Sequence, residues 1–227
     1  MLIRQATEAD LADMMAVDGR AFHSFYSEID RQYARQAIDL DRFVVALDGE
    51  ELIALAGSFE SELTLPGGGR LPMSGVTWVA VSATHRRQGM LRKLMATLDA
   101  QAEARAEPLM GLGSSEGGLY GRFGYGPVNR LRNVHIDRKL VEFIDPALSR
   151  PDAVNVTYAG DVVGALAERW ERYRRAQVGE VPRTEGELRW RLHQAGPALV
   201  AAMHDDGFAL WTAKRDWNGG LPAAEVE

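Results

Sequence analysis

Apolar and polar positions at the start of the chain predict one short strand followed by an amphipathic helix. Leu2 to Gln5 predicts a short first strand, and Thr7-Glu8-Ala9-Asp10 supplies a helix cap. The apolar positions that follow recur at helical spacing and define one buried face, made of Leu11, Met14, Met15 and Val17.

The next segment predicts a strand, a turn and a second strand. Residues 43–47 and 52–58 are apolar runs, and the intervening Asp48-Gly49-Glu50-Glu51 has turn composition. Residues 60–65 continue in extended conformation, and Pro66-Gly67-Gly68-Gly69 forms a loop before the central strand.

Residues 76–126 are the stretch around which the chain is organised. Val76 to Val81 suits a buried strand, 82–85 is polar, and a helix follows, with an apolar face of Leu91, Leu94, Met95, Leu98 and Ala102. Because this helix has crossover length, the strand predicted at 109–113 should run parallel to 76–81. We therefore expect an α/β fold with a mixed, mostly antiparallel sheet flanked by helices.

Glycines are dense from 113 to 126. Ser114 or Ser115 can cap a short helix through residues 116–123, which Gly124 and Gly126 end before a strand at 128–136. So many glycines weaken a helix, and close approach of the backbone to a ligand explains them better.

The character of the chain changes near residue 150. Residues 149–152 read as a linker between a domain at 1–150 and a second one at 151–227. Residues 161–177 predict a helix with Val162, Leu166, Trp170 and Tyr173 on its apolar side. Thr184 and Glu187 form a capping box for a second helix carrying Leu188 and Leu192, and 198–213 predicts a β-hairpin.

Composition excludes several kinds of protein. The net charge of −6 argues against a nucleic-acid binder with a basic surface. The chain has no cysteine, which excludes disulfides, thiolate metal sites and cysteine nucleophiles. No apolar run is long enough to span a membrane, and the start lacks a signal-peptide core, so we expect a cytoplasmic protein.

A basic loop precedes the central helix, with Arg86, Arg87, Arg92 and Lys93 around Gly89. The first N–H groups of a helix lack partners within it, and a glycine lets a phosphate approach the backbone. The loop therefore predicts a phosphate or pyrophosphate site, although a solvated basic helix start would have the same charges. Neither a P-loop nor a dinucleotide-binding glycine motif is present.

The pattern Arg86-x-x-Gly89-x-Leu91 resembles the acetyl-CoA loop of the GNAT acyltransferase superfamily. Three longer segments resemble the enhanced intracellular survival (Eis) family of GNAT N-acetyltransferases, in which a leucine at position 91 is usual. They are THRRQGMLR at 84–92, SSEGGLYGRFGYGP at 114–127 and LTLPGGGRLPMSGVTWVAV at 63–81. The resemblance implies a GNAT fold at 1–150, the start of a second, degenerate GNAT-like lobe at 151–227, and a chain lacking the family's C-terminal part.

The resemblance also implies the roles of individual residues. Tyr120 matches the family's general acid, and Tyr125 is its rival at a structural position. The acetyl-CoA cosubstrate would contact Val79, Ala80, Val81, Arg86, Arg87, Gln88, Gly89, Met90, Leu91, Arg92, Ser115 and Glu116. The acceptor pocket would contain Phe22, Phe25, Tyr26 and Trp78, and no metal is expected.

Two features of the site have alternatives. The aromatic residues at 21–29 can also be core packing under a loop, and the acidic residue that Eis-like enzymes carry near Ser24 is absent, so Glu28 or Asp30 would replace it. The family's base is a C-terminal carboxylate that this chain lacks. The amine would instead lose its proton through water, or through His85 or His23, unless the chain is inactive.

The sequence therefore predicts an acetyl-CoA-dependent N-acetyltransferase acting on a primary amine of a small molecule or a lysine side chain. One alternative is a CoA-binding or assembly module without catalysis, and another is a nucleic-acid binder using the basic cluster at 84–93. Neither nucleic acid nor a membrane is the expected partner. Because an unfinished sheet exposes strand edges, we expect a homo-oligomer whose interface includes residues 160–227.

Overall fold

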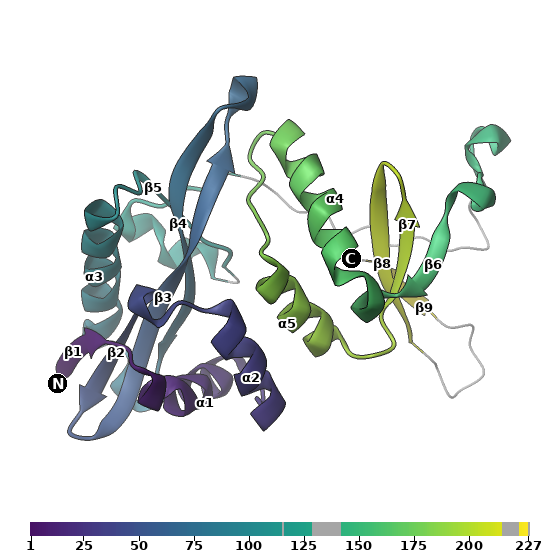
Figure 1. The fold of residues 1–227 in the computed structure, drawn as a ribbon. Helices are drawn as coiled ribbons and strands as arrows, with labels where there is room; N and C mark the ends of the chain where they lie inside the picture. The colour runs from purple at the N-terminus through teal and green to yellow at the C-terminus, as the bar shows by residue number, and fades with distance from the viewer. Residues whose placement is uncertain (115, 129–141, 215–222, 227) are drawn as a thin grey trace. The chain divides into compact units, whose positions relative to one another are not determined.

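The computed structural model describes residues 1–114, 116–128, 142–214 and 223–226. Contacts within the chain divide it into two compact units, each with its own sheet (Figure 1). The first unit comprises Met1–Ser115 and Trp170–Arg191, and the second comprises Glu116–Arg169 and Leu192–Glu227. The domain division at residue 150 that the sequence suggests stays a prediction.

The first unit is built on a five-stranded sheet with the strand order β1-β2-β3-β4-β5. Its strands are β1 (Leu2–Gln5), β2 (Phe43–Asp48), β3 (Glu51–Thr64), β4 (Arg70–Val81) and β5 (Leu109–Gly111). The first four are antiparallel to their neighbours, whereas β5 runs parallel to β4. This confirms the mixed, mostly antiparallel sheet.

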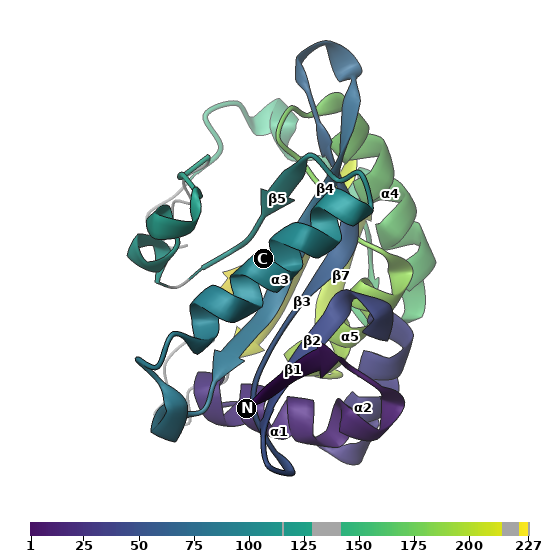
Figure 2. The ribbon, with the colours of Figure 1, turned by 90° about the vertical axis from the view of Figure 1, so that its left-hand side faces the viewer.

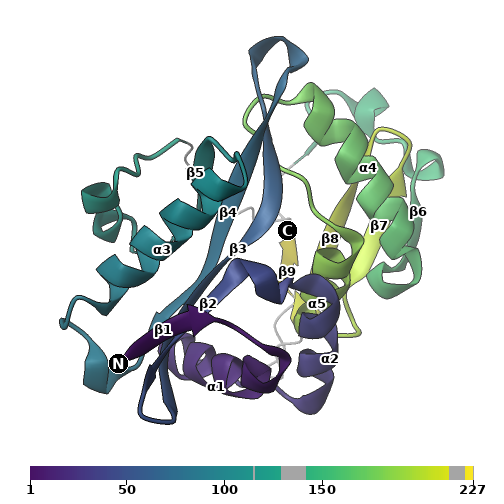
Figure 3. The same ribbon diagram turned by 60° about the vertical axis from the view of Figure 1, so that its left-hand side comes forward.

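Helices cover both faces of this sheet. α1 (Leu11–Phe22) and α2 (Glu28–Ala37) lie on one face, and α3 (Met90–Ala104) lies across β3 and β4 on the other (Figures 2 and 3). The face predicted for α1 is confirmed, because its four apolar residues are at most 2% exposed. On α3 the buried face begins with Met90, at 2% exposure, whereas Leu91 is only half-buried at its edge.

An aspartate carboxylate accepts capping hydrogen bonds at the N-terminus of each of the first two helices. Asp10 accepts hydrogen bonds from the backbone N–H and the hydroxyl of Thr7, at 2.8 and 2.7 Å. A 3-10 turn, Glu8–Asp10, leads from this cap into α1. Asp30 bonds the N–H and hydroxyl of Ser27 in the same way, at 2.7 and 2.6 Å, and so fixes the start of α2.

The pairing of β5 leaves one edge of β4 open. Its parallel direction confirms the prediction, but its partners are Met73–Gly75 and not the predicted 76–81. β5 ends at Gly111, so within the described residues no strand pairs with that edge of β4 from Val76 to Val81. The unpaired backbone groups there are available to a ligand.

The second sheet has four antiparallel strands in the order β6-β7-β8-β9. They are β6 (Asn155–Tyr158), β7 (Val200–His204), β8 (Gly207–Lys214) and β9 (Ala223–Val226). The hairpin predicted at 198–213 is confirmed as β7 and β8, whereas β6 and β9 extend the sheet beyond that prediction.

Two helices lie between β6 and β7 in the sequence, and the boundary between the units falls within both. They are α4 (Val163–Ala176) and α5 (Glu185–Ala195). The capping box of α5 is confirmed, since Glu187 accepts from the N–H and hydroxyl of Thr184. The apolar face predicted for α4 is partly wrong, because Tyr173 is 47% exposed. The next residue, Arg174, is buried and forms ion pairs with Glu62 and Glu171.

The segment after β5 differs from its prediction. Instead of one helix at 116–123, two 3-10 turns form, Gly117–Leu119 and Gly121–Phe123, because glycine disfavours a continuous helix. Gly124 ends them with a left-handed conformation, as expected. The strand predicted at 128–136 lies outside the described residues from 129 onward.

The described residues contain neither a membrane-spanning helix nor a cluster of metal ligands. None of the helices there combines the length and apolar character that crossing a bilayer requires. Within the same residues, no three histidine or carboxylate side chains converge as a metal site would need.

Candidate functional site

The loop between β4 and α3 has backbone N–H groups that are free to bind a ligand. A 3-10 turn, Ala83–His85, leads into Arg87 and Gly89, which have left-handed φ values of 63° and 79°. Within the described residues, the N–H groups from Arg86 to Arg92 donate to no protein acceptor. Free donors at the start of a 15-residue helix form a site for an anion.

The side chains of this loop divide into two groups. Arg86 donates from Nε to the Val81 carbonyl at 3.2 Å, and Gln88 donates to the Thr84 carbonyl at 3.3 Å, so both hold the loop to its own backbone. Three exposed cations have no ion-pair partner among the described residues, namely Arg87, Arg92 and Lys93. No acidic residue lies in the first turn of α3, so the local potential is positive.

β4 carries an irregularity just before this loop. Thr77 pairs with Gly57 and Ala80 pairs with Leu55, so Trp78 and Val79 together face one residue of β3. Trp78 has φ +50°, which is a strained conformation for an aromatic residue. A bulge of this kind takes backbone groups of β4 out of its ladder with β3.

The Trp78 side chain is the centre of an aromatic cluster. Its indole makes edge contacts with Phe43 of β2 and with Trp190 of α5, at centroid distances of 5.7 and 5.6 Å. Tyr26 stacks on it at 6.4 Å with the ring planes 12° apart. Trp190 is not among the predicted site residues, because no sequence pattern links a residue of α5 to the N-terminal sheet.

Asp18 is a buried carboxylate beside this cluster. It is 4% exposed and accepts a hydrogen bond from the Tyr26 hydroxyl at 2.8 Å. Burial raises the pKa of Asp18, an effect that the Tyr26 hydrogen bond partly offsets. Burial and the nearby Asp18 raise the pKa of Tyr26. Asp18 is not among the predicted site residues, although it lies four residues after Met14 and three after Met15 on the buried side of α1.

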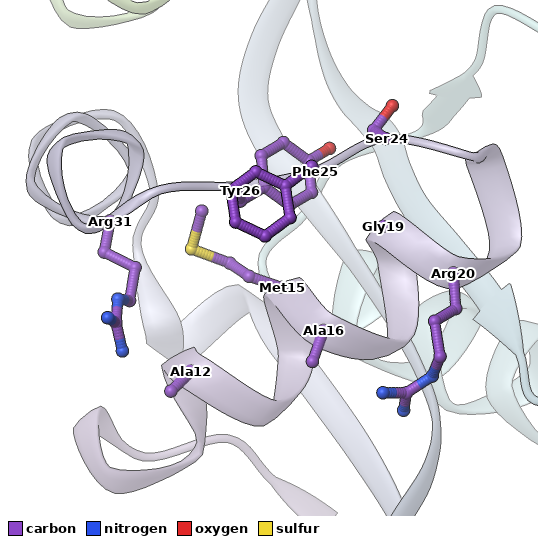
Figure 4. Close-up of a pocket in the computed structure, with 9 residues that line it drawn as sticks. All are labelled: Ala12, Met15, Ala16, Gly19, Arg20, Ser24, Phe25, Tyr26 and Arg31. Atoms are coloured by element: carbon purple, nitrogen blue, oxygen red, sulfur yellow. The ribbon is translucent and has the colours of Figure 1, made fainter.

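A shallow pocket lies between α1 and the loop that follows it (Figure 4). The loop turns back closely because Gly19 lacks a side chain: a Cβ there would lie 2.6 Å from the Ser24 carbonyl oxygen. The lining residues are Ala12, Met15, Ala16, Gly19, Arg20, Ser24, Phe25, Tyr26 and Arg31.

The aromatic residues predicted for the acceptor pocket have different environments. Phe25 and Tyr26 line the pocket, and Trp78 packs against Tyr26. Phe22 is not a lining residue and is 53% exposed, and Phe25 is 91% exposed, so core packing under a loop describes neither.

The two carboxylates expected to replace the acidic residue near Ser24 both have structural partners. Glu28 forms an ion pair with Arg31 one turn along α2. Asp30 caps the same helix through Ser27. Of the two histidines considered as bases, His85 accepts or donates at Thr84 Oγ1 and lies 3.5 Å from the Asp48 carboxylate, while His23 ends α1.

Tyr120 belongs to the second unit and closes the first of its 3-10 turns. Its half-buried ring contacts Tyr125 edge-on at 5.9 Å and Phe123 at 6.5 Å. Burial, and then the charge of the exposed Glu116, raise the pKa of Tyr120, so the phenol keeps its proton at neutral pH. Ser115 lies outside the described residues.

Comparisons with known proteins give the family. The chain is 31% identical over 223 residues to N-acetyltransferase Eis of Mycobacterium tuberculosis, covering 92% of this chain and 55% of the relative. An uncharacterized N-acetyltransferase of Streptomyces avermitilis is 30% identical over 210 residues, covering 87% of this chain and 51% of the relative. The chain thus spans about half the length of these curated relatives.

A solved structure and a family model also match this chain. The crystal structure of Eis1 from Mycobacterium abscessus matches with a TM-score of 0.79 and 27% identity, covering 100% of this chain and 58% of that one. Residues 2–128 match the model of the acetyltransferase (GNAT) domain, whose members use acetyl-CoA as cosubstrate. The chain therefore belongs to the GNAT acetyltransferase family and is similar to Eis.

Proposed function

We propose that this protein is an acetyl-CoA-dependent N-acetyltransferase that transfers an acetyl group to a primary amine of a small molecule or a lysine side chain. The observation that carries the proposal is the loop at 86–92 with its free backbone N–H groups. Arg87 and Arg92 of this loop and the adjoining Lys93 are three exposed cations without an ion-pair partner in the described part of the chain. Family membership supplies the reaction class to which this anion site would belong.

Cosubstrate binding would use two parts of the first unit. The N–H groups from Arg87 to Arg92 would hold the pyrophosphate, with the Arg87 and Arg92 guanidinium groups adding charge. The open edge of β4 at Val79, Ala80 and Val81 would pair with the pantetheine arm as an added strand does. Arg86 supports this arrangement by tying the loop to the Val81 carbonyl.

Two groups of the chain would contribute to catalysis. A backbone N–H turned outward at the Trp78–Val79 bulge would stabilise negative charge on the thioester oxygen as the amine attacks. Tyr120 would donate its phenol proton to the sulfur as the carbon–sulfur bond breaks, leaving CoA as a thiol. The amine must lose one proton to become the amide, and water or a protein group must accept it.

Thiol release tests the proposal. The intact protein is incubated with acetyl-CoA and a panel of primary amines, and free CoA thiol is measured with a disulfide reagent. We expect release that depends on the amine and yields the acetylated amine in equal amount. Affinity for acetyl-CoA without release for any amine would contradict catalysis and favour the CoA-binding module.

A further inference from the structure

Asp18 differs from the other carboxylates around the pocket because it is buried and, in the described part of the chain, lacks an ion-pair partner. Within the described residues it forms no ion pair, and its hydrogen-bond partner is the Tyr26 hydroxyl. The other charged groups nearby have different roles: Glu28 pairs with Arg31, Asp30 caps α2, and Arg20 is exposed at the pocket. Burying a carboxylate with one hydrogen bond lowers the stability of the fold, and groups with such a cost are candidates for a functional role.

Tyr26 connects this carboxylate to the pocket. Its ring lines the pocket in Figure 4, stacks on Trp78, and carries the hydroxyl that donates to Asp18. Asp18 itself is closed off from solvent and does not line the pocket. Tyr26 therefore both lines the pocket and bonds the buried carboxylate.

We propose that Tyr26 and Asp18 form a relay that removes the proton from the acceptor amine. This rests on the proposed acetyltransferase function and supplies the base that it lacks. The ammonium in the pocket gives its proton to Tyr26 Oη, while Tyr26 passes its own proton to Asp18 Oδ2. The neutral amine is then free to attack the thioester, and Asp18 returns the proton to solvent by the reverse path.

The environment suits each partner to its task. Burial gives the Asp18 carboxyl a pKa above its ordinary value, so it is a better base than an exposed aspartate at the same pH. The raised pKa of Tyr26 keeps the phenol protonated, as a relay requires when it donates and accepts in one step. Tyr26 is the residue that contacts the amine, and Asp18 acts through it.

The relay predicts a specific pH dependence for two variants. Asp18→Asn and Tyr26→Phe should each lower kcat/KM for an amine acceptor by about 10²-fold or more near pH 7, because general-base catalysis typically contributes roughly 10²–10⁴-fold. The loss should shrink as the pH approaches the pKa of the amine, because solution then supplies the neutral form. A merely structural defect would persist at every pH. Asp13→Asn, an exposed acid on the same helix, is the matched control and should behave as wild type.

Stability separates the relay from a packing role. Because burial opposes the charged form, Asp18→Asn should not lower the urea midpoint of the wild-type protein near neutral pH. If that variant does not fold, Tyr26→Phe decides, since it keeps the ring that stacks on Trp78.

Each kinetic outcome has one meaning. Wild-type turnover with unchanged pH profiles in folded Asp18→Asn or Tyr26→Phe would overturn the relay and leave the acetyltransferase proposal standing. Absence of turnover in the wild-type protein with every amine would overturn both. A loss in each variant that recovers at high pH is the expected result.

Discussion

The phenol ring of Tyr26 lies nearly parallel to the Trp78 indole, with the centroids 6.4 Å apart and the planes 12° apart. One residue comes from the loop after α1, and the other holds a strained backbone conformation in the β4 bulge. The contact joins the pocket of Figure 4 to the open edge of the sheet, where the acyl group would lie. In the proposed reaction, the acceptor amine would lie beside Tyr26 and the acyl group beside Trp78, and the stacked rings would hold the two sites at a fixed distance.

The first prediction concerns Tyr120. Tyr120→Phe keeps the ring that contacts Tyr125 and removes only the proton donor, so affinity for CoA should be unchanged. Turnover should fall by roughly 10²–10⁴-fold, as removal of a general acid typically does. Thiol-release kinetics and calorimetric CoA titration measure the two effects. Tyr125→Phe is the matched control, and a wild-type rate in Tyr120→Phe would assign Tyr120 to packing.

A buried ion pair gives the second prediction. Arg42, before β2, bonds Glu107, after α3, and both side chains are at most 7% exposed. Arg42→Met leaves the Glu107 carboxylate buried without its cation and should lower the free energy of unfolding by about 3–5 kcal/mol. Urea denaturation measures this. The double variant Arg42→Met with Glu107→Leu should recover part of the loss, and a single variant as stable as wild type would refute the role.

Acid stability depends on Asp10. Its bidentate hydrogen bonds from Arg4, at 2.7 and 2.8 Å, hold the pKa of this carboxyl well below its usual range. The folded pKa is lowered, so the stabilisation is present above the unfolded value of about 3.9 and is lost as the pH falls below it. Asp10→Asn should therefore lower the urea midpoint at pH 7, and its deficit should shrink below about pH 4. An equal deficit at both pH values would contradict this.

Oligomerisation remains a prediction, and the structure gives it a surface to test. In the segment 160–227, Tyr173 is 47% exposed and Val178 is 62% exposed. Exposed apolar side chains mark a contact with a partner when they belong to a continuous patch, which the oligomeric state of a variant can test. Multi-angle light scattering on the intact chain should give more than one copy, and Tyr173→Glu should shift the equilibrium toward monomer. A strictly monomeric intact chain would refute the homo-oligomer.

Elements with regular hydrophobic periodicity could be predicted from the sequence. The buried face of α1, the strands at 43–47 and 52–58, and the capping box at Thr184 follow local rules that the structure confirms. The segment at 116–123 shows the limit: its helix prediction followed a serine cap, but glycine conformational freedom favoured short turns.

Site features that depend on tertiary packing could not be predicted. The φ of Trp78 results from a register shift between two strands. β5 pairs with Met73–Gly75 of β4 and not with the predicted 76–81. Trp190 joins Trp78 from a helix more than a hundred residues away in the sequence. The basic loop was visible as composition and spacing, but its free N–H groups required the observed backbone.

The most direct test of the central claim, that the loop at 86–92 binds acetyl-CoA, is a calorimetric comparison of two glycine variants. Gly89 and Gly67 have φ values of 79° and 82°, and an added Cβ would meet no protein atom within 4 Å at either position. Gly89→Val and Gly67→Val should therefore suffer similar backbone strain and similar losses of stability. Only Gly89→Val should weaken CoA binding, by about 10-fold or about 1.4 kcal/mol, because its side chain meets the phosphates. Unchanged CoA affinity in folded Gly89→Val would contradict the claim, as would an equal loss in both variants.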